Sequence, residues 1–177
     1  MTIIKSSDEE SISTKMGIKL IKNFIKEKPI FNSIKKLLMS KDFPYFYHDS
    51  TANEFDKSNF FFAHVLHING EPRSSFFNQL AMPLLGRLNF NYLHRVKINL
   101  YTKQEKHFVS EPHRDMDANH YVALFSVNTN NGYTLFEDGT KVPSVENQCL
   151  IFNGSLKHSS ATQTDEKVRI NINLNLS

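Results

Sequence analysis

The sequence is poor in the features that mark secreted and membrane-spanning proteins. It has one cysteine, Cys149, so it cannot form an intramolecular disulfide, which suits a reducing compartment. Its apolar runs all fall short of the ~20 residues that a membrane-spanning helix needs. The opening stretch, MTIIKSSDEE, carries acidic residues where a secretory signal carries basic ones. We therefore expect a cytoplasmic protein that does not act in a membrane.

Tryptophan is absent, and glycine and proline are scarce. Fifteen phenylalanines and six tyrosines still supply large apolar side chains for a core. Six glycines and six prolines in 177 residues argue against a disordered or low-complexity chain. The net charge of +3 permits an anionic ligand but lacks the basic excess of a dedicated nucleic-acid binder. The length fits one domain, and we expect residues 1–177 to form it.

The first part of the chain, residues 1–91, mixes helical and strand patterns. Two segments repeat apolar residues at helical spacing, and two others are rich in aromatic and β-branched residues, as strands are. The predicted helices span residues 29–39 and 74–89, and the predicted strands span residues 43–48 and 60–68. Pro83 interrupts the second helix, where we expect a kink or a break. This part should support a core built by residues 92–177.

From about residue 92 onward, apolar residues alternate with polar ones, as they do in strands. Short strands separated by tight turns indicate a sandwich or a jelly roll. The predicted strands span residues 94–101, 120–128, 142–145, 148–152 and 168–176, with turns at 130–132 and 138–139. We expect a mainly β fold with flanking helices, in which residues 92–177 form the jelly-roll core and hold the functional site.

The last predicted strand alternates throughout. Its apolar positions, from Val168 to Leu176, share one face, and Arg169 shares the other face with the asparagines at 171, 173 and 175. Such a strand can have one buried and one solvated face. In a jelly roll, the polar face can instead line the mouth of the barrel.

Three residues of this half have the chemistry of a metal site. His113 and Asp115 are two positions apart, so on a strand they project from the same face. His158 follows the apolar strand that ends at Phe152. Two histidines and one carboxylate form the facial triad that binds iron(II) and leaves positions open for cosubstrate, oxygen and water. The pattern predicts a catalytic iron site, with Asp117 as the less favoured alternative to Asp115.

Arg169 lies beyond His158, on the polar face of the last predicted strand. Arginine is suited to bidentate binding of a carboxylate. If 2-oxoglutarate chelates the iron through its 2-oxo acid end, its distal carboxylate needs a cation at the far side of the pocket. Arg169 is the predicted partner of that carboxylate.

The stretches EPHRDMD, NTNNGYTLFEDGTKVPSVENQCLIFNGSLKHSS and KVRININ together resemble the 2-oxoglutarate- and iron(II)-dependent dioxygenase superfamily, in particular its prolyl-4-hydroxylase-like branch. The sequence looks especially similar to small members encoded by marine bacteriophages and bacteria, over residues 92 to the end. The resemblance implies a double-stranded β-helix (cupin-like) core and a requirement for Fe(II), 2-oxoglutarate and O2. It implies His113, Asp115 and His158 as iron ligands and Arg169 as the cosubstrate anchor. For a phage-encoded member, the cytoplasm would be that of the host.

The resemblance also implies further contacts to the cosubstrate. Tyr101 matches a position that often donates a hydrogen bond to 2-oxoglutarate, and Asn99 points the same way. Asn171 stands where relatives often have a hydroxyl residue, and Phe125 stands where several have a tyrosine that contacts the cosubstrate. Tyr101, Asn99 and Asn171 are therefore the additional candidates, and one hydrogen bond is expected to be missing at Phe125.

The implied reaction is hydroxylation of an unactivated C–H bond, with release of succinate and CO2. The expected substrate is a prolyl residue of a peptide or protein, and the alternative is a free amino acid or another small molecule. A nucleic-acid demethylase of this superfamily usually carries a second arginine shortly after the anchor, and none follows Arg169 here. A non-catalytic jelly-roll binding module has no reason to keep an open triad with a carboxylate anchor behind it.

Overall fold

The computed structural model describes residues 3, 11–13, 17–50 and 59–177. Within these ranges the chain forms three helices and twelve strands. The helices are α1 (Lys28–Leu38), α2 (Phe77–Leu80) and α3 (Met82–Leu85), and the strands are β1 (Ser11–Ser13), β2 (Lys19–Ile21), β3 (Phe46–His48), β4 (Phe61–Ile68), β5 (Glu71–Pro72), β6 (Leu93–Thr102), β7 (Tyr121–Ser126), β8 (Asn130–Phe136), β9 (Lys141–Ser144), β10 (Gln148–Asn153), β11 (His158–Ala161) and β12 (Val168–Leu176).

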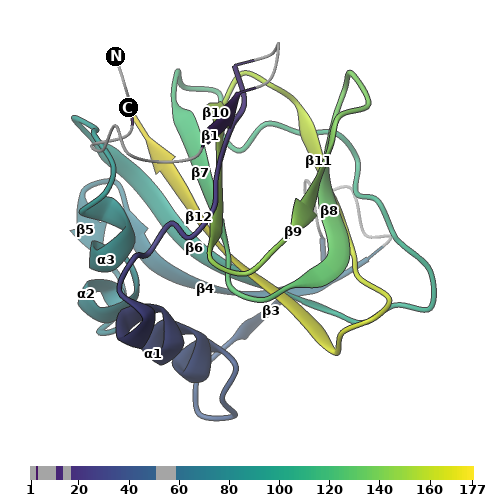
Figure 1. Ribbon diagram of the computed structural model, residues 1–177, viewed down its shortest axis with the longest axis horizontal. Coiled ribbons are helices and arrows are strands. Elements are labelled where there is room, and N and C mark those ends of the chain that lie inside the picture. Colours follow the sequence, from purple (N-terminus) through teal and green to yellow (C-terminus); the bar gives the residue numbers. More distant parts are fainter. Residues whose placement is uncertain (1–2, 4–10, 14–16, 51–58) are drawn as a thin grey trace.

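The strands form two antiparallel sheets that face each other (Figure 1). The large sheet has the order β1-β2-β10-β7-β12-β6-β4-β3, with β5 paired to β4, and the small sheet has the order β11-β8-β9. The last strand, β12, lies between β6 and β7, so strands far apart in the sequence become neighbours. This is the arrangement of a jelly roll, and the predicted mainly β fold with flanking helices is confirmed.

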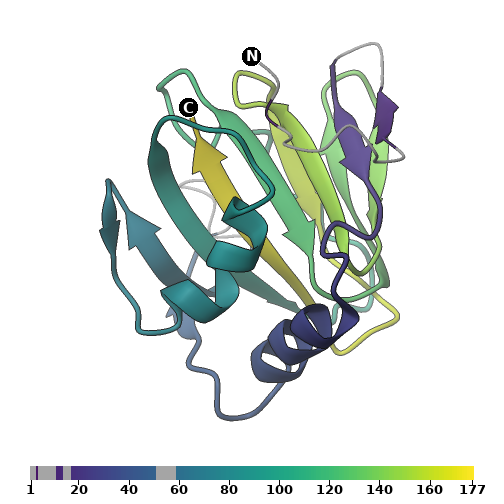
Figure 2. The same ribbon diagram turned by 60° about the vertical axis from the view of Figure 1, so that its left-hand side comes forward.

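The three helices cover the outer face of the large sheet (Figure 2). Helix α1 has Pro29 in its first turn, where the missing N–H costs nothing, and it buries Phe31, Ile34 and Leu38. Phe31 packs edge-on against Phe125 of β7, with the ring centroids 6.2 Å apart. Burying each such side chain contributes about 1.5–3 kcal/mol. None of the helices in the described part of the chain is long and apolar enough to span a bilayer.

A second apolar cluster fills one end of the space between the two sheets. Phe136 of the small sheet and Phe152 of the large sheet meet edge to face, with centroids 5.1 Å apart. Val122 and Leu150 pack around them. The other end of this space is lined by polar side chains, so the inner face of the large sheet changes from apolar at β10 and β7 to polar at β12 and β6.

The predicted turn at residues 130–132 is wrong. These residues begin β8, and the chain bends just before them. Asn-Asn-Gly favours a turn locally, but pairing of β8 with both β9 and β11 keeps it extended. The predicted turn at 138–139 is confirmed, and Gly139 has the positive φ of 86° that favours glycine there.

The predicted helix at 74–89 is two short helices. Ala81 separates α2 from α3, and Pro83 lies in the first turn of α3, where proline is tolerated. The expected break is confirmed. The predicted strand at 43–48 is shorter than expected, because only Phe46–His48 pairs with β4.

Candidate metal centre and carboxylate pocket

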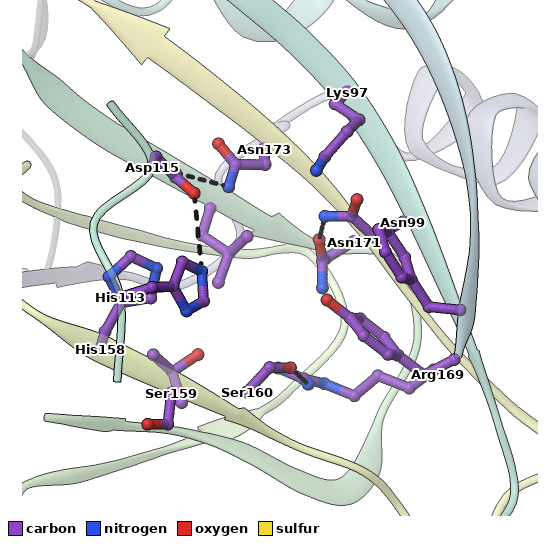
Figure 3. Close-up of a pocket in the computed structure, with 14 residues that line it drawn as sticks. Lys97, Asn99, His113, Asp115, His158, Ser159, Ser160, Arg169, Asn171 and Asn173 are labelled. Atoms are coloured by element: carbon purple, nitrogen blue, oxygen red, sulfur yellow. Dashed lines mark hydrogen bonds and ion pairs between the residues drawn. The ribbon is translucent and has the colours of Figure 1, made fainter. Parts of the chain in front are cut away.

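The pocket between the two sheets is built on the register of β6 and β12. Directly paired residues of an antiparallel ladder point to the same face, and Arg169 pairs with Tyr101 while Asn171 pairs with Asn99. The remaining pairs of this polar ladder are Asn173 with Lys97 and Asn175 with Arg95. Most of these side chains line one cavity with His113, Asp115 and His158, as Figure 3 shows. The polar face of β12 therefore lines the mouth of the barrel and is not a solvated outer face.

The predicted triad comes together from a loop and the start of a strand. His113 and His158 pair through two backbone hydrogen bonds of 3.0 Å, and their rings lie 4.8 Å apart. Asp115 follows in the connection between β6 and β7, with Oδ1 4.0 Å from Nε2 of His113. The expectation that His113 and Asp115 share a strand is wrong: His113 forms a single bridge, and the chain bends at Asp115. The bend still directs both side chains to one point.

The hydrogen bonds of the two imidazoles engage Nδ1 and leave Nε2 of each ring available to bind a metal ion. Nδ1 of His113 lies 3.1 Å from the carbonyl oxygen of Glu111, and Nδ1 of His158 lies 3.3 Å from that of Leu156. A carbonyl oxygen only accepts, so in the neutral form of each ring Nδ1 carries the proton and Nε2 keeps its lone pair. Carbonyl contacts of this kind orient metal-binding histidines in proteins.

The Asp115 carboxylate is held by the polar face of β12. Oδ2 accepts hydrogen bonds of 2.9 Å from Nδ2 of both Asn173 and Asn175, and Oδ1 lies 3.5 Å from Nη2 of Arg95. Burial alone would raise the pKa of Asp115, but His158 in its protonated form, the charge of Arg95 and the two amide hydrogen bonds outweigh it. The pKa of this carboxyl is therefore held well below its usual range, and the group stays an anion.

These residues fit a divalent metal ion. The three donor atoms lie within 4.8 Å of one another, so small side-chain rotations bring them to metal–ligand distances of about 2 Å. Two neutral imidazoles and one carboxylate form the donor set of a non-haem iron(II) site with open positions. His113 and Asp115 border the cavity, so those open positions would face its interior.

Arg169 closes the other end of the pocket. It is 2% exposed; Nε donates to Ser144 Oγ at 2.8 Å, and Nη1 donates to Ser160 Oγ at 2.6 Å and to the Ala161 carbonyl at 3.1 Å. The guanidinium carbon lies 5.4 Å from the centre of the Tyr101 ring. Burial lowers the pKa of Arg169, yet a guanidinium remains charged at neutral pH. No carboxylate in the described ranges pairs with it, so it is suited to an anionic ligand.

Gly132 makes room for Arg169. A Cβ at this position would lie 2.8 Å from Cδ of Arg169 and 2.9 Å from the Ala161 carbonyl oxygen. The sequence indicated a turn glycine, whereas the structure requires glycine for close approach. Alternation of side chains with a period of two around Gly132, which is typical of a strand, would have been the signal in the sequence that this glycine is not in a turn.

The other cosubstrate candidates also lie in this pocket. Tyr101 is buried beside Arg169, and burial raises the pKa of its phenol, so it remains a hydrogen-bond donor. Nδ2 of Asn99 donates to Oδ1 of Asn171 at 2.9 Å, which joins β6 to β12 across the floor. Phe125 does not reach the pocket; it packs against Phe24 and the helices, and its neighbour Leu124 lines the cavity.

Several residues near the triad in sequence are not part of it. Asp117 is exposed, and the exposed His107 contacts the Thr162 carbonyl. His120 is buried with Nδ1 2.7 Å from the Ala118 carbonyl. The sequence placed Asn173 and Asn175 on the polar face of the last strand but predicted no contact between them and the triad. It did not single out the other residues that surround the triad and Arg169 in the fold: Arg95, Lys97, Thr134, Ser144 and Ser160.

No protein-family model and no curated protein sequence matches this chain. Solved structures do. An oxidoreductase of the 2-oxoglutarate–Fe(II) oxygenase family from Burkholderia pseudomallei superposes with a TM-score of 0.62 at 10% identity, over 92% of this chain and 86% of that one. The 2-oxoglutarate-dependent epimerase SnoN of nogalamycin biosynthesis has a TM-score of 0.62 at 13% identity, over 92% and 78% of the two chains.

A third similar structure is a prolyl hydroxylase from Trichoplax adhaerens in complex with a peptide fragment of the hypoxia-inducible factor. Its TM-score is 0.60 at 15% identity, over 92% of this chain and 84% of that one. Identities this low establish shared architecture only. The chain therefore has the jelly-roll fold of the 2-oxoglutarate- and iron(II)-dependent oxygenases, as its sequence motifs led us to expect.

Proposed function

We propose that this protein is an iron(II)- and 2-oxoglutarate-dependent dioxygenase that hydroxylates an unactivated C–H bond. The observation that carries the proposal is the coexistence, in one pocket, of the triad His113, Asp115 and His158 with the buried and unneutralised Arg169. A structural metal site would explain the triad alone. It would not explain a fully buried guanidinium at the opposite end of the same cavity, which costs free energy unless an anion binds there.

In this proposal each residue has a separate task. His113, Asp115 and His158 hold the metal, and Arg169, with help from Tyr101, binds the distal carboxylate of 2-oxoglutarate. Bound iron and 2-oxoglutarate supply the oxidative chemistry that splits the cosubstrate into succinate and CO2 and oxidises the substrate. The protein orients both reactants, and the surrounding sheets exclude water from the reacting atoms.

The proposed substrate is a prolyl residue of a peptide or protein. The sequence resemblance to prolyl-4-hydroxylases and the fold shared with the peptide-bound Trichoplax enzyme support this choice. A free amino acid or another small molecule is the alternative within the same reaction class, and SnoN, from nogalamycin biosynthesis, shares the fold equally well.

The test uses the purified chain with iron(II) and 2-oxoglutarate in the absence of oxygen. We expect a visible charge-transfer band from the chelate, and formation of succinate after air is admitted. His158→Ala should abolish both signals. His107→Ala removes an exposed histidine outside the pocket and should leave both signals unchanged. Absence of the band and of succinate in the parent protein would sink the proposal.

A further inference from the structure

Lys97 is a cation in the pocket to which the triad and Arg169 give no role. It lies on β6, pairs with Asn173 of β12 and lines the same cavity as Asp115 and Arg169. Its Nζ sits 5.2 Å from the centre of the Phe61 ring. Among the described residues, no carboxylate lies within 4 Å of it. A lysine placed here without an anion is poorly compensated.

A single molecule of 2-oxoglutarate does not account for both cations. Lys97 and Tyr101 are four residues apart on β6, which corresponds to about 13 Å at 3.3 Å per residue, and Arg169 is the direct partner of Tyr101. Figure 3 shows Lys97 and Arg169 along one wall of the pocket and the triad on the opposite wall. A cosubstrate that spans from Arg169 to the triad therefore crosses the pocket and does not extend along the wall to Lys97. The space between Lys97 and the triad is left for the substrate.

The charges of the pocket point in the same direction. Iron(II) and doubly ionised 2-oxoglutarate cancel each other. The charged side chains at the cavity are then three cations, namely Lys97, Arg169 and the Arg95 that pairs with Asp115, and one carboxylate, Asp115. A net positive charge remains, which an anionic substrate would reduce.

Two buried amide oxygens near Lys97 also have no hydrogen-bond partner, namely Oδ1 of Asn99 and Oδ1 of Asn173. The orientation of Asn173 is set by its Nδ2, which donates to the Asp115 carboxylate. A buried acceptor of this kind calls for an N–H donor. Lys97 with these two oxygens thus offers a cation for a carboxylate beside acceptors for an amine or amide N–H, the two polar groups of an amino acid.

We infer that Lys97 binds a carboxylate of the substrate, so that the enzyme acts on an anionic, amino-acid-like molecule. This inference rests on the proposed dioxygenase function and narrows its substrate. The carboxylate has two possible sources, the α-carboxylate of a free amino acid or an acidic side chain next to a prolyl residue in a peptide. Burial and the charge of Arg95 lower the pKa of Lys97 to about 8, as expected for an ammonium group that lacks its counter-ion, although Asp115 acts to raise it.

The test compares matched ligands that differ only in charge. Binding to the protein loaded with Mn(II) and 2-oxoglutarate is measured by calorimetry, and succinate release is measured separately with iron(II) and air. The probes are L-proline against L-prolinamide, and blocked prolyl dipeptides that carry Asp against those that carry Asn. The variants are Lys97→Met and Lys97→Arg. Lys141→Met is the control, because Lys141 also lies over an aromatic ring, Tyr133, but outside the pocket.

We expect a carboxylate probe to bind at least about tenfold more tightly than its amide counterpart, a difference of about 1.4 kcal/mol. Lys97→Met should remove this preference, Lys97→Arg should keep most of it, and Lys141→Met should not change it. The member of the panel that binds identifies the source of the carboxylate. Substrate-free succinate release and the concentration dependence on 2-oxoglutarate should stay within about twofold of the parent in the control Lys141→Met.

Three results would overturn the inference: equal binding of acids and amides, no binding of any acid at millimolar concentration, or a loss of 2-oxoglutarate binding in Lys97→Met. The last result would assign Lys97 to the cosubstrate. The calorimetric arm does not depend on turnover. If acids bound through Lys97 but no succinate formed with iron(II), the dioxygenase proposal would be wrong. The inference that Lys97 binds a carboxylate would still be supported.

Discussion

At the scale of single residues, the pocket is a set of side chains whose protonation and direction are decided by a few hydrogen bonds. In the neutral form of the two histidines the proton is on Nδ1, which faces a carbonyl, so Nε2 keeps its lone pair. Arg169 is held at Nε and Nη1 by Ser144, Ser160 and a carbonyl, so its charge is in place before a ligand arrives. Preorganisation of this kind lowers the cost of binding.

Replacing Arg169 with Met should weaken 2-oxoglutarate binding by between about tenfold and a hundredfold, because hydrogen bonds to charged groups contribute about 1.5–3 kcal/mol. Arg169→Lys should lose less, since it keeps the charge but not the paired geometry. The measurement is the 2-oxoglutarate concentration that gives half-maximal succinate release. Arg114→Met, at an exposed arginine that donates to the Ser155 carbonyl, is the control and should behave as the parent. A normal 2-oxoglutarate dependence in Arg169→Met would remove this residue from the site.

At the scale of elements, the two faces of β12 have different roles. Its apolar face, which includes Ile170, Ile172 and Leu174, packs in the core beneath the helices. Its polar face extends from Arg169, at the proposed cosubstrate end, to Asn173 and Asn175, which donate hydrogen bonds to the Asp115 carboxylate. A shift of this strand by one residue would turn its apolar side chains toward the pocket and its polar side chains toward the core. Both the pocket and the core would be lost, so the function depends on the register of the strand.

Asn173→Leu and Asn175→Leu should each lower metal affinity, because partners that hydrogen-bond to a ligand typically contribute about 10–100-fold. The double variant should lose more than either single variant. Metal affinity is measured by titrating Mn(II) without 2-oxoglutarate, with circular dichroism to confirm that each variant folds. Asn171→Leu changes the same face of β12 but does not touch Asp115, so its Mn(II) affinity should match the parent. Unaltered affinity in the double variant would show that the two amides do not support the metal ligand.

At the scale of the whole molecule, the candidate metal ligands come from parts of the chain that strand pairing alone joins only weakly. His158 belongs to the small sheet, and Asp115 lies in a connection that reaches the large sheet through Asn173 and Asn175. A metal ion bound by both would tie the two sheets together at the mouth of the barrel, next to the apolar cluster, whose Phe152 ring lies 4.9 Å from the ring of His158.

Metal binding should therefore stabilise the fold as a whole. At a metal concentration 100 times the dissociation constant the gain is about 2.7 kcal/mol, which corresponds to about 5–10 °C in Tm for a chain of this size. Thermal unfolding with Mn(II), and then with excess EDTA, measures the rise and its reversal. His113→Ala should show neither. A Tm that does not respond to metal in the parent protein would argue against a site formed in the native state.

Much of this arrangement could be predicted from local pattern. The alternation in residues 168–176 predicted β12 and its two faces, and the helical spacing in residues 29–39 predicted α1 to within one residue at each end. Spacing and residue type also singled out His113, Asp115, His158 and Arg169 as candidates. Local pattern failed at residues 130–132, where a strong turn signal is overridden by strand pairing on both sides of β8.

The sequence by itself therefore determined the strand-rich second half, the chemistry of the candidate ligands and the choice of Arg169 as the candidate anion-binding residue, because these depend on residue type and short-range period. Only the tertiary structure decided which side chains surround them. The pairing of β6 with β12 sets Lys97 beside Asn173, and the crossover of β12 between β6 and β7 brings Asn173 and Asn175 to Asp115. These contacts join residues far apart in the chain, and no local period encodes which strands become neighbours.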